Sequence, residues 1–213
     1  MKTRRAFTLI EMLVVIAIIA IVAALVVNMS ALAKAKQREA QVNAGKRSLM
    51  LMIEDYHATL NFYPPDNGLL VSNSANSFYD GFAATNPLIY ELTGATNNYN
   101  GGGKILVFDT NLDQTAYNSV FNRLAVNNGN PDEPHDFYHY GPQHKDYTNY
   151  LGSNGPEGLL APVPYSDFPG VANYWHYDSS TTNRHNPMSY DLWVEYSAPG
   201  KNNVFVTNGN WQQ

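Results

Sequence analysis

A run of 22 residues without a charged side chain, from Met12 to Ala33, constrains this sequence most. Nearly every residue in it is Ala, Val, Leu, Ile or Met, and about 20 such residues in an α-helix cross the hydrocarbon of a bilayer. The run follows a short basic leader, MKTRRA, and the carboxylate of Glu11 lies at its start. A charge costs on the order of 2.5–3.5 kcal/mol at the centre of a membrane helix, so we expect Glu11 to have a compensating partner.

Two interpretations of this segment require no special function. A cleaved secretory signal peptide would combine the basic start and the apolar run with Ala31-Leu32-Ala33 as its cleavage site. The run is longer than the roughly 7–15 residues of an ordinary signal core, however, and Glu11 does not fit such a core. The second interpretation is a signal anchor that holds a soluble domain at a membrane.

A third interpretation comes from the residues around the start of the run. Arg4-Arg5-Ala6 followed by Phe7-Thr8-Leu9-Ile10-Glu11 resembles the leader and methylation motif of type IV pilins and type II secretion pseudopilins. The resemblance implies that prepilin peptidase cuts between Ala6 and Phe7 on the cytoplasmic side and methylates the new amino group. Two positions depart from the family pattern, because Ala6 replaces the usual Gly and Asn28 replaces a helix-bending Pro found in many relatives.

The resemblance also implies an organisation and a location. We expect a leader peptide over residues 1–6, a transmembrane and assembly half of a helix over 7–33, an amphipathic half over 34–63 and a globular head over 64–213. The protein would be a single-pass protein of the bacterial inner membrane with its head in the periplasm. It would assemble with copies of itself and other pilin-like subunits into a filament, which could extend outside the cell.

The helix is expected to continue beyond the apolar run. No Pro occurs before Pro64, and an apolar stripe recurs at spacings of three, four and seven residues. One helix from about Thr8 to Phe62 would be about 80 Å long, with a second half that packs on its own head. The stripe consists of Val42, Leu49, Ile53, Tyr56 and Leu60.

The rest of the sequence predicts a small antiparallel β-sheet laid on the long helix, in an α+β fold. Helices are expected over 86–94, where Asn86 caps the start and Gly94 ends the helix, and over 113–125. Strands are expected over 105–108, 171–177, 190–196 and 203–207, with alternate residues of 190–196 facing opposite ways. Residues 97–103 and 127–170 are expected to form loops, the second of them an insertion.

Charge and composition exclude some functions. The chain has 13 basic and 18 acidic residues, and loss of residues 1–6 would change the net charge from −5 to −8. Such a surface is unsuited to binding nucleic acid through phosphates. We find no catalytic nucleophile motif, phosphate-binding loop or zinc spacing, so we expect no enzyme. Because the chain has no cysteine, the head must be held by packing or by an ion.

Two places could in principle hold a metal ion. A group at His135, Asp136, His139 and His144 has the residue types of a metal site, but Pro134, Gly141 and Pro142 disfavour a helix there, and solvated loop histidines are favoured.

The second place is the C-terminal region, which resembles the tail of major pseudopilins at Asn186-Pro187, Ser189 to Trp193, Gly200 to Asn203 and Asn210-Trp211. In those proteins the loop after the strand binds calcium. Here the loop 197–203 has no carboxylate, so Asp191 is a weak calcium candidate, and no cofactor is otherwise expected.

These observations favour a structural subunit of a type II secretion pseudopilus or of a type IV pilus. The alternative is a membrane-anchored extracytoplasmic domain whose Tyr- and Asn-rich head recognises a glycan or a peptide.

Overall fold

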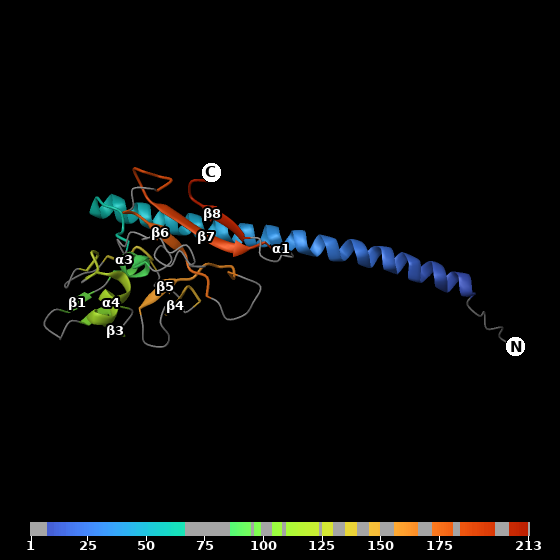
Figure 1. Cartoon of the computed structure of the whole chain (residues 1–213), viewed down its shortest axis with the longest axis horizontal. Helices are drawn as coiled ribbons and strands as arrows, with labels where there is room; N and C mark the ends of the chain where they lie inside the picture. The colour runs from blue at the N-terminus through green and yellow to red at the C-terminus, as the bar shows by residue number, and fades with distance from the viewer. Residues whose placement is uncertain are drawn as a thin grey trace, which may run out of the picture.

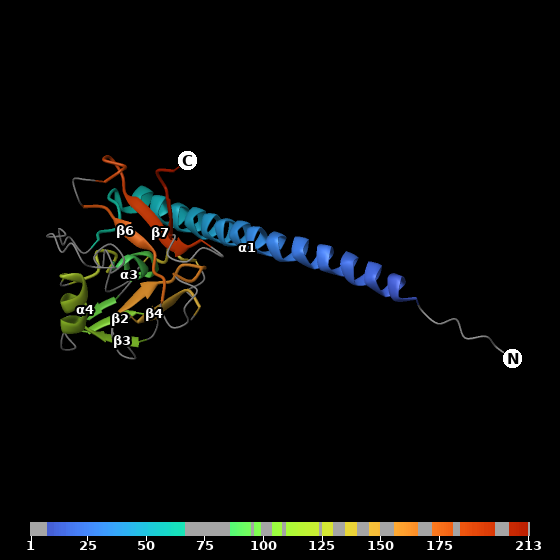
Figure 2. The same ribbon diagram turned by 45° about the vertical axis from the view of Figure 1, so that its right-hand side comes forward.

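The computed structural model describes residues 8–66, 86–94, 96–98, 104–107, 110–123, 125–129, 135–139, 145–149, 156–165, 172–180, 184–198 and 205–212. The side chains of residues 25–31, 96–98, 104–107 and 110–112 are outside this description. A long helix, α1 (Leu9–Leu60), extends from a head that the later elements form around its C-terminal half (Figure 1). A second view shows the N-terminal half of α1 extending well beyond the head (Figure 2).

The two ends of α1 have clear local causes. Thr8 has extended backbone and caps the first turn, while Asn61 adopts the left-handed conformation at φ 64° and ends the helix. Two prolines then follow, and neither can donate a helical hydrogen bond. The helix contains 52 residues and is about 78 Å long. The sequence-based expectation of one helix over 8–62 is confirmed to within two residues.

The head is α+β, as predicted, and its described strands form three small antiparallel sheets. One sheet has the order β1-β2-β3, a second pairs β4 with β5, and a third has the order β6-β7-β8. The elements after α1 are α3 (Leu88–Thr93), β1 (Thr96–Asn98), β2 (Lys104–Val107), β3 (Thr110–Asp113), α4 (Gln114–Phe121), β4 (Tyr147–Asn149), β5 (Glu157–Leu159), β6 (His176–Asp178), β7 (Asp191–Ser197) and β8 (Phe205–Gly209).

Several boundaries differ from the sequence-based expectations. Helix α4 ends at Phe121 rather than near 125, because Asn122 takes the left-handed conformation at φ 52°. Strand β1 lies mostly within the expected loop 97–103, and β3 was not expected. The expected loop 127–170 contains the strands β4 and β5, which are only three residues long and therefore too short for a visible alternation. Strand β6 begins at His176, later than expected, and Tyr174 instead forms an isolated bridge with Leu160.

The core joins the buried face of the C-terminal half of α1 to α3, α4, β6 and β7. Val42, Leu49, Ile53 and Tyr56 of the predicted stripe are buried, and Leu60 is partly buried against them. The predicted alternation of 190–196 is confirmed in part. Tyr190, Leu192, Val194 and Tyr196 are buried and Trp193 and Glu195 are less so, but Asp191 on the other face is buried too. Gly45 lies within the stripe, where a Cβ atom would be 3.1 Å from Cζ2 of Trp175, so its lack of a side chain lets the Trp175 ring approach the helix.

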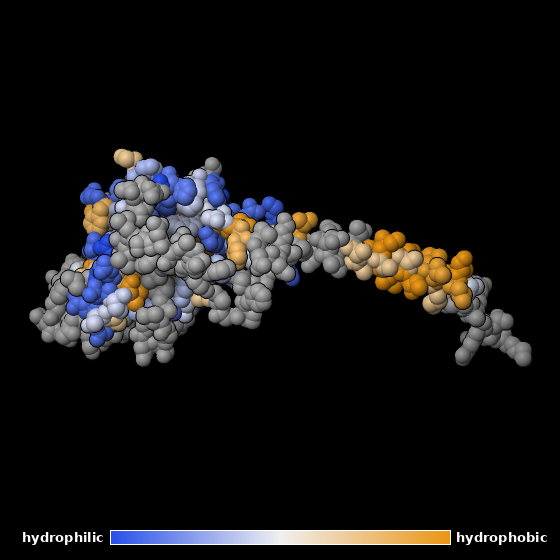
Figure 3. Space-filling view, in the orientation of Figure 1, coloured by the Kyte–Doolittle hydropathy of each residue, from blue (hydrophilic) through white to orange (hydrophobic). Residues whose placement is uncertain are grey.

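Hydropathy divides the molecule along α1. The described N-terminal half is apolar on its visible face, whereas polar residues predominate on the visible face of the head (Figure 3). Within the residues that the structure describes, no helix is both long enough and apolar enough to cross a membrane.

Candidate assembly site

The first turn of α1 is organised by Thr8 and Glu11. Oε2 of Glu11 accepts hydrogen bonds from the backbone N–H and the hydroxyl of Thr8, both at 2.8 Å, and Oγ1 of Thr8 accepts one from the N–H of Glu11 at 3.4 Å. This reciprocal arrangement is a capping box, which satisfies backbone N–H groups that a helix start otherwise leaves unbonded. The carboxylate that the sequence marked as a candidate assembly residue thus stabilises the start of its own helix.

The other two candidate residues of this site, Ala6 and Phe7, lie outside the described residues. Thr8 is the residue directly after Phe7, so the capping box lies one residue from the expected cleavage point. Both capping contacts of the carboxylate use Oε2.

The helix beyond the capping box exposes apolar side chains on all sides. Large apolar residues between Leu9 and Val22 are 47–83 % exposed, although side chains of this type are normally buried. An exposed apolar surface of this extent marks a site of protein or membrane interaction. The residues are Leu9, Ile10, Met12, Leu13, Val14, Val15, Ile16, Ile18, Ile19, Ile21 and Val22.

A buried carboxylate fixes the opposite half of α1 to the head. Glu91 on α3 is fully buried, and its Oε2 accepts hydrogen bonds from the hydroxyl of Tyr56 on α1 at 2.9 Å and from the N–H of Asn128 at 2.9 Å. Its Oε1 accepts a third hydrogen bond from the N–H of Asn127 at 2.8 Å. Burial raises the pKa of Glu91, and burial together with the nearby Glu91 raises the pKa of Tyr56 far above its usual range. The network connects α1, α3 and the segment after α4.

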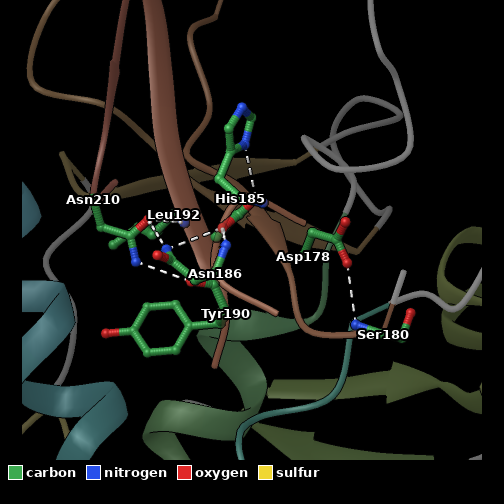
Figure 4. Close-up of polar contacts among 8 residues, drawn as sticks. Asp178, Ser180, His185, Asn186, Tyr190, Leu192 and Asn210 are labelled. Carbon is green, nitrogen blue, oxygen red and sulfur yellow. Dashed lines mark hydrogen bonds and ion pairs between the residues drawn. The ribbon is translucent and has the colours of Figure 1, made fainter. Parts of the chain in front are cut away.

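Asp191 is the centre of a polar cluster at the start of β7. Its Oδ2 accepts from the N–H of His185 at 2.7 Å and lies 3.1 Å from Nδ1 of the same ring, while its Oδ1 accepts from the N–H and the side-chain amide of Asn186, both at 3.0 Å. The side chains of Asn186 and Asn210 both donate to the carbonyl of Tyr190 (Figure 4). The carboxylate that was the calcium candidate is therefore 4 % exposed and engaged by the turn that precedes its own strand.

The histidine group has separate contacts. Asp136 accepts a hydrogen bond from the N–H of Tyr138, His135 packs against the ring of Phe137, and Nε2 of His139 lies 3.8 Å from the carboxylate of Asp55. His144 lies outside the described residues. In the part of the chain that the structure describes, no three His, Asp or Glu side chains come together as a metal site.

Comparison with known protein families gives one match. Residues 1–27 match the prokaryotic N-terminal methylation motif, which includes Ala6, Phe7 and the capping box. This match supports a type IV pilin-like, prepilin-type protein. No curated protein and no solved structure matches the chain, so the assignment of this prepilin-type protein depends on its first 27 residues.

Two important head residues were missed from the sequence. Lys46 occupies a position between Val42 and Leu49 on the buried stripe, and Glu91 interrupts the otherwise apolar start of the expected helix 86–94. One signal in the sequence could have identified both as buried, hydrogen-bonded residues. Each is a charged residue at a position that periodicity assigns to the core, and such residues are rarely buried without partners.

Proposed function

We propose that this prepilin-type protein is the structural subunit of a filament that assembles from the inner membrane, either a type II secretion pseudopilus or a type IV pilus. The observation that carries the proposal is the position of the motif at the end of an exposed apolar helix that extends beyond its head (Figure 3). Many such helices packed together would bury this surface in a filament core. The role is mechanical, with subunit addition pushing secreted proteins outward, and involves no catalysis.

Before assembly, the same surface requires a membrane. We propose that residues 7–33 cross the inner membrane, with the head in the periplasm, because residues 12–33 contain no charge. Prepilin peptidase would remove residues 1–6 and methylate Phe7. The mature chain would then consist of the helix half 7–33, the amphipathic half 34–63 and the head 64–213.

Glu11 would join subunits by pairing with an amine that cleavage creates. The new ammonium of Phe7 is four residues from Glu11, about 6 Å along a helix axis. Within a growing filament, the Phe7 ammonium of an incoming subunit would meet the Glu11 carboxylate of the subunit ahead of it. Such a pair offsets the cost of desolvating both charges and fixes the axial register of the subunits.

Intact-mass measurement of the protein from its native membrane tests the processing step. We expect a chain that begins with N-methylated Phe7 and retains residues 12–33. A mature chain that begins at Lys34 would identify an ordinary signal peptide and contradict the proposal.

Filament yield tests the role of Glu11. Glu11→Val should still be inserted and processed, but should enter sheared filaments at a level at least tenfold below wild type. That factor corresponds to about 1.4 kcal/mol, less than the cost of breaking a buried ion pair. Glu39→Val makes the same change in the polar half of α1 and should assemble like wild type. If Glu11→Val assembles like wild type, the pairing is wrong, and a membrane-anchored domain that binds a glycan or a peptide becomes the better interpretation.

A further inference from the structure

Lys46 is a buried cation in the middle of the face that α1 turns to the head. Its side chain is 7 % exposed, and Nζ donates to Oδ1 of Asn208 at 2.6 Å and to the carbonyl oxygen of Gly209 at 2.8 Å. Both acceptors are neutral, and an ammonium has a third hydrogen to donate. The two bonds tie β8 to α1 but leave the positive charge uncompensated.

No described carboxylate forms an ion pair with this ammonium. Among the described residues, no carboxylate lies within 4 Å of the Lys46 ammonium, and Glu39, about two turns earlier on α1, forms a salt bridge of 3.0 Å with Lys36. Burial, together with the charge of neighbouring Arg47, lowers the pKa of Lys46. A cation removed from water is costly unless an opposite charge reaches it, so this position favours an anion.

A pocket of about 410 Å³ opens beside this cation, between α1 and β8. Its size is within the range of small-molecule sites. Next to Lys46, it is lined by the polar side chains of Asn43, Tyr196, Thr207, Asn208 and Gln212. Asn208 already bonds to Lys46 and to Oδ1 of Asn43, and Oε1 of Gln212 accepts from the N–H of Gly209, so the amide N–H groups of Asn43 and Gln212 and the hydroxyl of Thr207 are the groups nearest to hand for a ligand. Glu39 also lines the pocket, so a ligand with several negative charges would be repelled.

We propose that this pocket binds a small monocarboxylate, whose carboxylate accepts a hydrogen bond from the Lys46 ammonium while the amide and hydroxyl groups around it bind the rest of the molecule. Occupation would stabilise the attachment of β8, and hence of the C-terminal sheet, to α1. The proposal depends only on the geometry of the head and is independent of filament assembly.

Thermal unfolding of the full chain in detergent micelles tests the proposal, with acetate and butyrate as ligands and chloride as the balancing ion at constant ionic strength. The wild-type midpoint should rise saturably, by about 3–6 °C at ten times the dissociation constant. Lys46→Met should lose this response. Lys34→Met, the same change at an exposed position of α1, should retain it.

A second measurement uses the wild type alone, in case Lys46→Met does not fold. In protein labelled with ¹⁵N-lysine, the Nζ signal of Lys46 should shift with acetate along the same saturation curve as the midpoint. No shift of Nζ up to 50 mM acetate, or an equal rise of the midpoint in Lys46→Met, would overturn the proposal. A third result would also refute the small-ligand site. If acetate has no effect, and the midpoint rises with protein concentration in wild type but not in Lys46→Met, the carboxylate that binds Lys46 comes from a second copy of the chain.

Discussion

Removing the carboxylate of Glu91 should weaken the attachment of α1 to its head more than any other single polar change we can identify. Glu91 is fully buried and accepts hydrogen bonds from Tyr56, Asn127 and Asn128. Glu91→Ala leaves the hydroxyl of Tyr56 and the N–H of Asn128 buried without this acceptor, whereas Asn127 is exposed and can bond to water. At about 1–3 kcal/mol for each buried donor, the expected loss is about 2–6 kcal/mol.

More conservative variants separate the parts of this loss. Glu91→Gln keeps one oxygen and most of the shape, so we expect it to lose about 1–2 kcal/mol near neutral pH. Tyr56→Phe removes one donor and leaves two, and should lose a similar amount. Because both changes act on the same hydrogen bond, the double variant should lose less than the sum of the two single variants, with a coupling energy of about 0.5–1.5 kcal/mol.

The direction of the pH dependence follows from the pKa of Glu91. Burial raises this pKa above the ordinary value of 4.5, so ionising Glu91 is harder in the folded state than in the unfolded state. The contribution of Glu91 to stability is therefore fully present below pH 4.5 and declines as the pH rises through the folded pKa. The stability advantage of wild type over Glu91→Gln should be largest at acid pH.

Denaturant unfolding of the full chain in micelles, followed by circular dichroism and tryptophan fluorescence at several pH values, measures these differences. Glu39→Gln is a suitable control, because its salt bridge with Lys36 is largely exposed and should contribute less than about 0.5 kcal/mol. If Glu91→Gln is as stable as wild type at every pH and does not couple to Tyr56→Phe, the reasoning about this network is wrong.

Three further predictions concern the rest of the head. In Gly209→Ala, the new Cβ would lie 2.6 Å from ring atoms of Trp211, so the ring must move, and we expect a loss of about 1–3 kcal/mol together with a change in tryptophan emission. Addition of calcium or of a chelator should move the thermal midpoint by less than about 1 °C, because the N–H groups of His185 and Asn186 already bond to the carboxylate of Asp191. A large calcium-dependent rise would contradict this. A shortened chain that begins at Lys34 should remain monomeric and folded by circular dichroism, since Val42 is the first buried residue among the described side chains of α1. Loss of structure would show that the apolar half supports the head.

Much of α1 could be predicted from the sequence, because its causes are local. Periodicity, the absence of Pro before Pro64 and the cap at its start are all readable within a few residues. The helix expected over 86–94 was only partly predicted. Helix α3 begins at Leu88 with Pro87, not Asn86, at the N-cap position, although Oδ1 of Asn86 accepts from the N–H of Leu88, and Gly94 ends the helix as expected. The alternation along β7 likewise predicted the buried apolar side chains, but not the burial of Asp191.

The short strands could not be predicted, because three or four residues carry too little pattern. β4 and β5 form within the expected loop 127–170 because each supplies the other with a backbone partner, which is a property of the pair. Asp191 shows a different limit in the site. Its carboxylate accepts from the N–H groups of His185 and Asn186, six and five residues earlier, but the turn conformation that points these groups at it was not read from the sequence.

The sequence by itself determined the features of this protein that depend on neighbours in the chain, namely the apolar uncharged run, the motif around Phe7 and Glu11, the long helix and the stripe on its second half. Only the tertiary structure decided which charges the head could bury. Lys46 and Glu91 are polar residues at positions where periodicity predicts apolar ones. Both can be buried because distant segments provide hydrogen-bond partners. β8 provides them for Lys46, and the segment at Asn127 and Asn128 provides them for Glu91. The physical reason is that a polar group can leave water only when a specific partner replaces it, and such partners lie at separations of up to 163 residues along this chain.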